Sequence, residues 1–142
     1  MALKNPTPKE LAADWIASQK DGADEGTTGH LAQFFFSGFP EEEPELTWET
    51  ITLVMQAYPE ADFFALNKTE AQEVCGVLAA GPVEDLLSYH GDRYIRKFEE
   101  EALRDRRMAW LLVGTYQFRM TDEVWHRVQL AADHTYWTRS VS

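Results

Sequence analysis

The sequence has no lysine or arginine from Asp21 to Asn67, although this stretch carries ten carboxylates and eight aromatic residues. Because no neighbour in sequence compensates these carboxylates, the stretch has a negative field of the kind that steers positively charged partners. Aromatic side chains are also among the residues that most often anchor protein interfaces. The stretch therefore indicates a binding protein, and acids that only keep the protein dispersed are the open alternative.

The excess negative charge belongs to the first part of the chain. Residues 1–90 hold 16 acids and 4 bases, a net charge of −12, and residues 91–142 hold 8 acids and 9 bases, a net charge of +1. Together they give the formal net charge of −11. A balance this negative argues against binding nucleic acid through its phosphates and against docking on anionic lipid.

Other absences bound the class of protein. The single cysteine, Cys75, excludes an internal disulfide and fits a reducing compartment, so we expect a cytoplasmic protein. No apolar run approaches the roughly 18 to 20 residues that span a bilayer, and the first residues lack the apolar centre of a secretory signal. The 142 residues fit a single helical domain over 1–142, with loosely attached tails at 1–6 and 134–142.

Helical patterns cover most of the chain. The segment 7–10, Thr-Pro-Lys-Glu, is a capping box with proline at the first helical position, and Asn67 with Glu70 predicts another helix start. Apolar residues from Trp48 to Tyr58 recur at helical spacing. These patterns predict an all-α fold, a compact bundle of about seven or eight short helices. Repeat-like helix pairs are one packing that fits, although the sequence has no regular internal period.

Glycine, proline and acids between residues 81 and 91 predict helix boundaries. Gly81 is suited to end one helix, and Pro82 to occupy the first position of the next. Glu84 and Asp85 would then lie in a first turn, where carboxylates interact favourably with exposed amides. We interpret these four residues as a structural motif, and His90-Gly91 as the end of that helix.

The run from Leu78 to Leu87, LAAGPVEDLL, resembles the motif L-A-A-G-P-[LV]-E-D-L-L of an uncharacterised family of small bacterial all-helical proteins, a domain of unknown function. Segments 11–16, 44–51 and 122–128 are similar to further elements of that family. The resemblance covers roughly residues 10–128, with departures at 62–68 and 21–43. It implies a helical fold and brings no activity.

No catalytic signature competes with the binding interpretation. In the strongest constellation, Glu84, Asp85 and His90, the histidine lies off the i+3 and i+4 positions that share a helix face with Glu84. The four histidines and the cysteine show no zinc spacing, and residues 21–26 lack the spacing of a calcium loop. We expect no catalytic residue, metal or cofactor. The alternative of an enzyme requires a deep pocket around His90 or His126.

Our leading hypothesis is a non-enzymatic protein-binding domain, specifically an immunity-type inhibitor that neutralises a cationic toxin or effector. Its partner would be a basic protein, and the oligomeric state stays open. A helical adaptor or scaffold domain is the alternative, and salt separates the two because screening weakens a steered complex. The candidate contact residues are Glu41, Glu42, Glu43, Glu45, Phe39, Trp48, Asp24 and Glu25.

Overall fold

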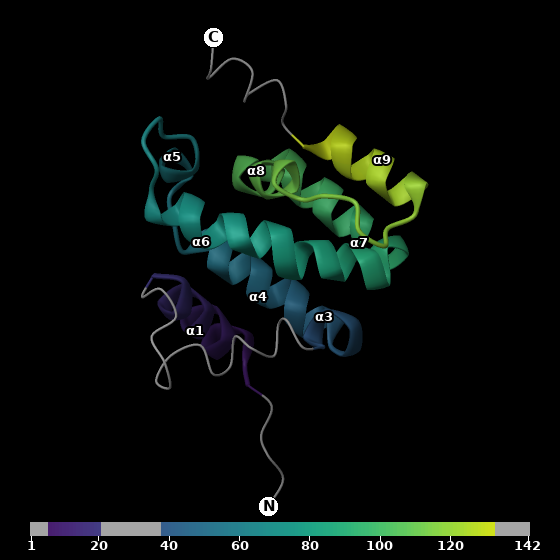
Figure 1. Ribbon diagram of the computed structural model, residues 1–142, viewed down its shortest axis with the longest axis horizontal. Helices are drawn as coiled ribbons and strands as arrows, with labels where there is room; N and C mark the ends of the chain where they lie inside the picture. Colours follow the sequence, from purple (N-terminus) through teal and green to yellow (C-terminus); the bar gives the residue numbers. More distant parts are fainter. Residues whose placement is uncertain (1–5, 21–37, 133–142) are drawn as a thin grey trace, which may run out of the picture.

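Most segments with helical periodicity in the sequence form helices in the structure, which confirms the predicted all-α class (Figure 1). The structure, a computed structural model, describes residues 6–20 and 38–132, and no strand occurs within these ranges. In chain order the elements are α1 (Pro8–Lys20), α3 (Phe39–Glu42), α4 (Pro44–Gln56), α5 (Glu60–Phe63), α6 (Glu70–Leu78), the π-helical turn η1 (Ala79–Val83), α7 (Glu84–Arg104), α8 (Arg106–Val113) and α9 (Asp122–Ala131).

The helices form three layers around one long central rod. Helix α6, the turn η1 and the first part of α7, up to the kink at His90, follow one another without a connecting loop and cross the middle of the molecule (Figure 1). Helices α1, α3 and α4 pack on one side of this rod, and α8 and α9 pack on the other. Both outer layers therefore meet the same continuous element.

The core lies between these layers. Trp15 of α1 is fully buried, and its indole Nε1 donates to the carbonyl oxygen of Val74 in α6 at 3.3 Å. Buried indoles combine large apolar contact with one polar atom that needs a partner, and this hydrogen bond supplies it. The other largest fully buried side chains include Tyr94, Phe63, Phe98, Leu11, Ile51, Met55, Leu78, Leu86, Leu87 and Ile95.

The first predicted cap is confirmed and the second is wrong. The Thr7 hydroxyl accepts from the backbone of Glu10 at 3.1 Å, and the Glu10 carboxylate accepts from the backbone of Thr7 at 3.2 Å. At α6 the capping residue is Thr69, paired with Gln72, and not Asn67. The Gln72 amide also donates to the carbonyl oxygens of Phe63, at the end of α5, and of Ala65 in the loop that follows, at 3.0 Å each. These contacts fix the start of α6, and they are invisible in the local sequence.

The predicted helix boundary at Gly81 and Pro82 is also wrong. Both residues lie inside η1, which joins α6 to α7 as a single wide turn. Proline has no N–H to donate and its ring collides with the carbonyl four residues before it, and a wider turn relieves both problems. The predicted helix end at His90-Gly91, by contrast, is confirmed. His90 has non-helical angles, φ −134° and ψ 35°, and this kink divides α7 into two helical parts.

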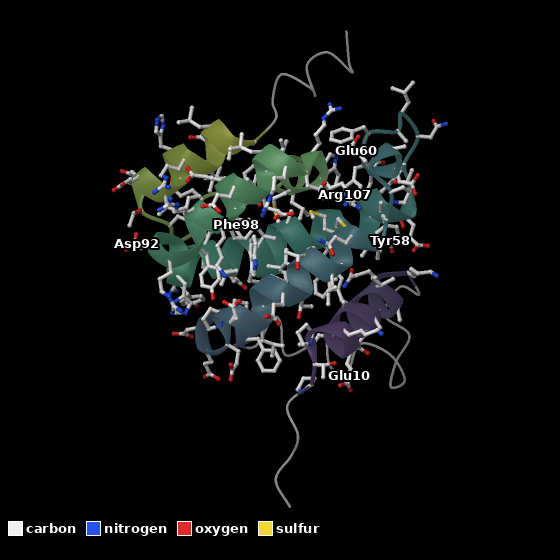
Figure 2. The ribbon with its side chains drawn as sticks, turned by 180° about the vertical axis from the view of Figure 1, so that it is seen from behind. Glu10, Tyr58, Glu60, Asp92, Phe98 and Arg107 are labelled. Atoms are coloured by element: carbon white, nitrogen blue, oxygen red, sulfur yellow. The ribbon has the colours of Figure 1, made fainter. Side chains whose placement is uncertain are left out.

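Arg107 ties α8 to the end of the bundle that holds Tyr58 and Glu60 (Figure 2). Its Nη1 donates to the carbonyl oxygen of Tyr58 at 2.7 Å, and its Nη2 pairs with Asp105 Oδ2 at 2.7 Å. Asp105 also caps α8 by accepting from the Arg107 backbone at 3.0 Å. The hydrogen bonds from the Arg107 side chain hold the pKa of Asp105 below its ordinary value.

Several sequence-based expectations concern residues outside the described ranges. They are the candidate contacts Asp24 and Glu25, residues 1–5 of the predicted tail at 1–6, and the predicted tail at 134–142. Within the described ranges, no helix is long and apolar enough to cross a membrane.

Candidate functional site

Three carboxylates project where α3 meets α4. Glu41 and Glu42 belong to α3, and Glu43 caps the start of α4. We call these three residues the acidic corner. All three are exposed, and no lysine or arginine of the described residues forms an ion pair with them. The three carboxylates of the acidic corner are therefore not paired with any described lysine or arginine.

Glu45 differs from the acidic corner, because residues distant in sequence compensate it. Its Oε2 accepts from the Tyr94 hydroxyl at 2.8 Å and lies 3.5 Å from Lys97 Nζ. Burial, and then the hydrogen bond to Glu45, raises the pKa of Tyr94 to about 12. Glu45 thus joins α4 to α7, and its carboxylate is only partly available to a partner.

The two candidate aromatic anchors are half-buried. Trp48 packs edge-to-face on Phe98, with ring centroids 4.8 Å apart and planes at 85°. Its outer part borders a groove of about 360 Å³ between α4 and α7, with Lys97 Nζ 5.8 Å above the indole ring. Phe39 packs against the core at the start of α3. Each ring is therefore fixed on one side by the core, and Trp48 is the one that also lines a groove.

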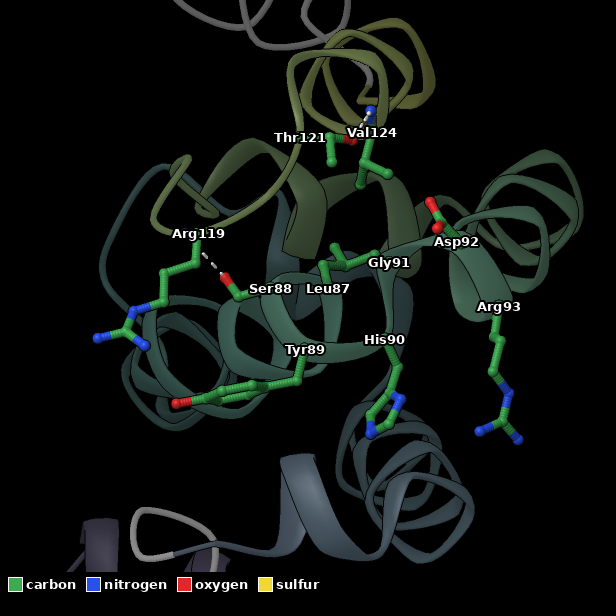
Figure 3. A pocket seen from close by; sticks show the side chains of 10 residues that line it. All are labelled: Leu87, Ser88, Tyr89, His90, Gly91, Asp92, Arg93, Arg119, Thr121 and Val124. Atoms are coloured by element: carbon green, nitrogen blue, oxygen red, sulfur yellow. Dashed lines mark hydrogen bonds between the residues drawn. The ribbon is translucent and has the colours of Figure 1, made fainter.

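The kink in α7 brings His90 to the acidic corner. His90 Nε2 lies 2.6 Å from the carbonyl oxygen of Glu41, so the ring nitrogen donates to it. A pocket of about 220 Å³ lies beside the kink (Figure 3). Ser88 also lines the pocket, but its hydroxyl accepts from the backbone of Arg119 at 3.2 Å. Figure 3 shows the side chains of Ser88 and His90 pointing in different directions, so His90 is not placed to act as a base for this hydroxyl.

Three aromatic side chains on α7 and on the loop before α9 are exposed, and the sequence interpretation missed them. Tyr89 of α7 is 41% exposed, and Tyr116 and Phe118 of the loop before α9 are 68% and 57% exposed. We call these three residues the aromatic rim. The loop is held to α7 because Glu84 Oε2 accepts from the backbone of Tyr116 at 3.3 Å. Two aromatic residues in a short non-helical segment were the available signal, since such residues need a packing partner or a binding role.

Glu84 and Asp85 lie in the first turn of α7, as predicted, but neither side chain caps it, because α7 continues directly from η1. Glu84 holds the Tyr116 loop, and burial raises its pKa although the Tyr116 N–H acts in the opposite direction. Burial also raises the pKa of Asp85. Among the described residues, no three histidine, cysteine or acidic side chains gather as a metal site would require. Cys75 is buried.

Comparison with known proteins gives one match. A family model, described as a family of unknown function (DUF6869), matches residues 32–136. The match includes the acidic corner, the η1 turn and the aromatic rim. No curated protein and no solved structure matches the chain. Because the model covers well over half of the 142 residues, the chain belongs to this family of unknown function.

Proposed function

We propose that the protein is a non-enzymatic binding domain that recognises a basic protein through the acidic corner. The observation that carries the proposal is the exposure of Glu41, Glu42 and Glu43 without a described cation beside them. Glu45, by contrast, lies against Lys97. A local excess of one charge raises the rate at which an opposite charge arrives. The acids would therefore act mainly on association.

Affinity would come from the aromatic side chains beside the corner. Interfaces depend on a few large side chains that leave water on binding, and tryptophan is prominent among them. Trp48 is already held by Phe98, so it would lose little conformational entropy when a partner covers its outer part. We further propose that the basic partner is a toxin or effector and that this protein is its immunity-type inhibitor. Strong charge complementarity, which gives fast capture, suits that role.

The test replaces the three acids of the corner by glutamine, in the variant Glu41→Gln, Glu42→Gln, Glu43→Gln. Glu45 stays, because it joins α4 to α7. A control variant removes the same charge elsewhere, with glutamine at the exposed residues Glu60, Glu73 and Glu123. The wild type and both variants are used at low salt to capture proteins from the source cell. A captured basic protein is then tested for toxicity and for neutralisation.

We expect the corner variant to lose on-rate by roughly tenfold or more at low salt, and the control to change far less. Raising the ionic strength should remove the advantage of the wild type, because exposed charges are screened over about 8 Å at physiological salt. Equal loss in both variants would show that net charge matters and not the corner. Equal capture by all three proteins would show that these acids do not recognise the partner and only keep the protein soluble.

A helical adaptor domain is the second candidate, and the aromatic rim is the observation that favours it. Three exposed rings on one loop and the adjoining helix can anchor a partner with little dependence on charge. The variant Tyr116→Ser, Phe118→Ser would then abolish capture, whereas the corner variant would retain it. If capture depends on the corner and is indifferent to the rim, the adaptor proposal fails.

A further inference from the structure

We infer that the outer faces of α7 and α9 form the contact between two copies of this chain. A groove of about 480 Å³ lies between the C-terminal ends of these helices. Apolar side chains line it, and two of them are leucines with almost all of their surface in water. Leu103 is 89% exposed and Leu130 is 72% exposed. Single exposed leucines are ordinary, but two at one groove make a patch that association would cover.

The two helices form a continuous face along which these leucines lie. The start of α9 touches the kinked part of α7, where a Cβ at Gly91 would meet Val124 at 3.1 Å. Further along, Arg127 of α9 pairs with Glu99 of α7. Leu103 and Leu130 follow at the far end. The helices therefore run in the same direction, and α9 is held to α7 before the groove is reached.

The charges around the groove are balanced, and this balance indicates a second copy as the occupant. Arg96 Nε lies 3.1 Å from Glu100 Oε1, and Arg127 Nε donates to Glu99 Oε2 at 2.9 Å. Two copies with a net charge of −11 repel each other at most orientations. A surface where each cation has its anion lets them approach without that repulsion. It offers no attraction to a strongly basic or strongly acidic partner.

A two-fold axis through the groove would place each copy's leucines against those of the other. Such an axis repeats every contact, so each copy contributes the same two leucines to the interface. A contact of two helices per copy is small beside a standard interface of about 800 Å² per partner. We therefore expect a reversible dimer with a dissociation constant on the order of micromolar.

Sedimentation equilibrium of the full chain tests the dimer. The variants are Leu103→Glu and Leu130→Glu, and the matched control is Leu66→Glu. Leu66 is 91% exposed in the loop between α5 and α6 and lies outside the groove. All three side chains are largely in water, so the fold should tolerate each change. We expect the wild type and the Leu66 variant to dimerise alike, and each groove variant to associate at least about tenfold more weakly.

Salt separates this inference from the proposed function. The dimer should hold or tighten as ionic strength rises, because screening reduces the repulsion between two acidic chains, whereas capture at the acidic corner weakens. A wild type that stays monomeric up to roughly 1 mM would overturn the dimer, as would groove variants that associate normally. A monomer whose melting temperature falls in Leu103→Glu would show a groove covered within the chain, by residues 133–142, and would overturn it too.

Discussion

Replacing Gly91 by alanine probes how closely α9 is seated on the kink of α7. Alanine in a helix is normally more stable than glycine by about 0.5–1 kcal/mol. At Gly91, however, the added Cβ would lie 3.1 Å from both Cγ1 and Cγ2 of Val124, a side chain that is only 4% exposed. One of the two must move, and overpacking of this kind typically costs about 1–3 kcal/mol. We therefore expect Gly91→Ala to destabilise the protein by about 1 kcal/mol.

A double-mutant cycle with Val124→Ala isolates the steric cost. Removing both Cγ atoms leaves room for the new Cβ, so Gly91→Ala should then stabilise by about 0.5–1 kcal/mol. The effect changes sign, and the coupling free energy is about 2 kcal/mol, within the range for residues in contact. Gly76→Ala in α6 is the control, since its Cβ would meet nothing within 4 Å. It should stabilise the protein in every background.

Urea unfolding measures the three changes, with the slope of the transition checked for two-state behaviour. In thermal unfolding, about 1 kcal/mol corresponds to roughly 3–4 °C for a chain of this size. If Gly91→Ala stabilises the wild type as much as Gly76→Ala does, the close contact between the two helices does not exist. If Gly91→Ala still destabilises the protein in the Val124→Ala background, the loss of stability arises from the kink itself and not from packing against α9.

Three further predictions test other contacts. Asp105→Ala should destabilise by about 2–3 kcal/mol in urea unfolding, because it removes the α8 cap and the carboxylate that pairs with Arg107. Burial raises the pKa of Asp85, so the folded state favours its protonated form and stability falls as the pH rises through that pKa. Asp85→Asn should therefore be more stable than wild type near pH 7 and equal to it near pH 3, below both pKa values. Burial raises the pKa of the Cys75 thiol to about 12, so thiol reagents should react only after unfolding.

Local signals in the sequence predicted individual helices well and their boundaries less well. The Thr7 cap is right because both of its hydrogen bonds lie within four residues. The cap at Asn67 is wrong because Thr69 also donates to the carbonyl of Asp62 at 2.6 Å, a loop contact that fixes the helix start. The prediction that Pro82 starts a helix is wrong, because a wide π-helical turn at this residue keeps the chain helical between α6 and α7.

The candidate site shows the same limit for charge. The count of charges along the chain found the acidic corner, because its three carboxylates are consecutive in sequence. The structure shows that all three are exposed. The count could not show that Lys97, 52 residues from Glu45, lies against that carboxylate. Nor could it show that Glu84 holds the loop of Tyr116, 32 residues away. Interactions between distant residues depend on the packing of the layers, which periodicity alone does not determine.

The η1 turn sets the rotational phase between the two halves of the central rod. An α-helix advances by about 100° per residue. The direction of a side chain in the first part of α7 therefore depends on how many residues separate it from α6. Deleting one residue from η1 would restore a regular α-helical turn and rotate the side chains of α7 before the kink at His90 by roughly that angle. Leu86 and Leu87 would then leave the core while charged neighbours entered it. The length of this one turn therefore keeps both outer layers in register with the same helix.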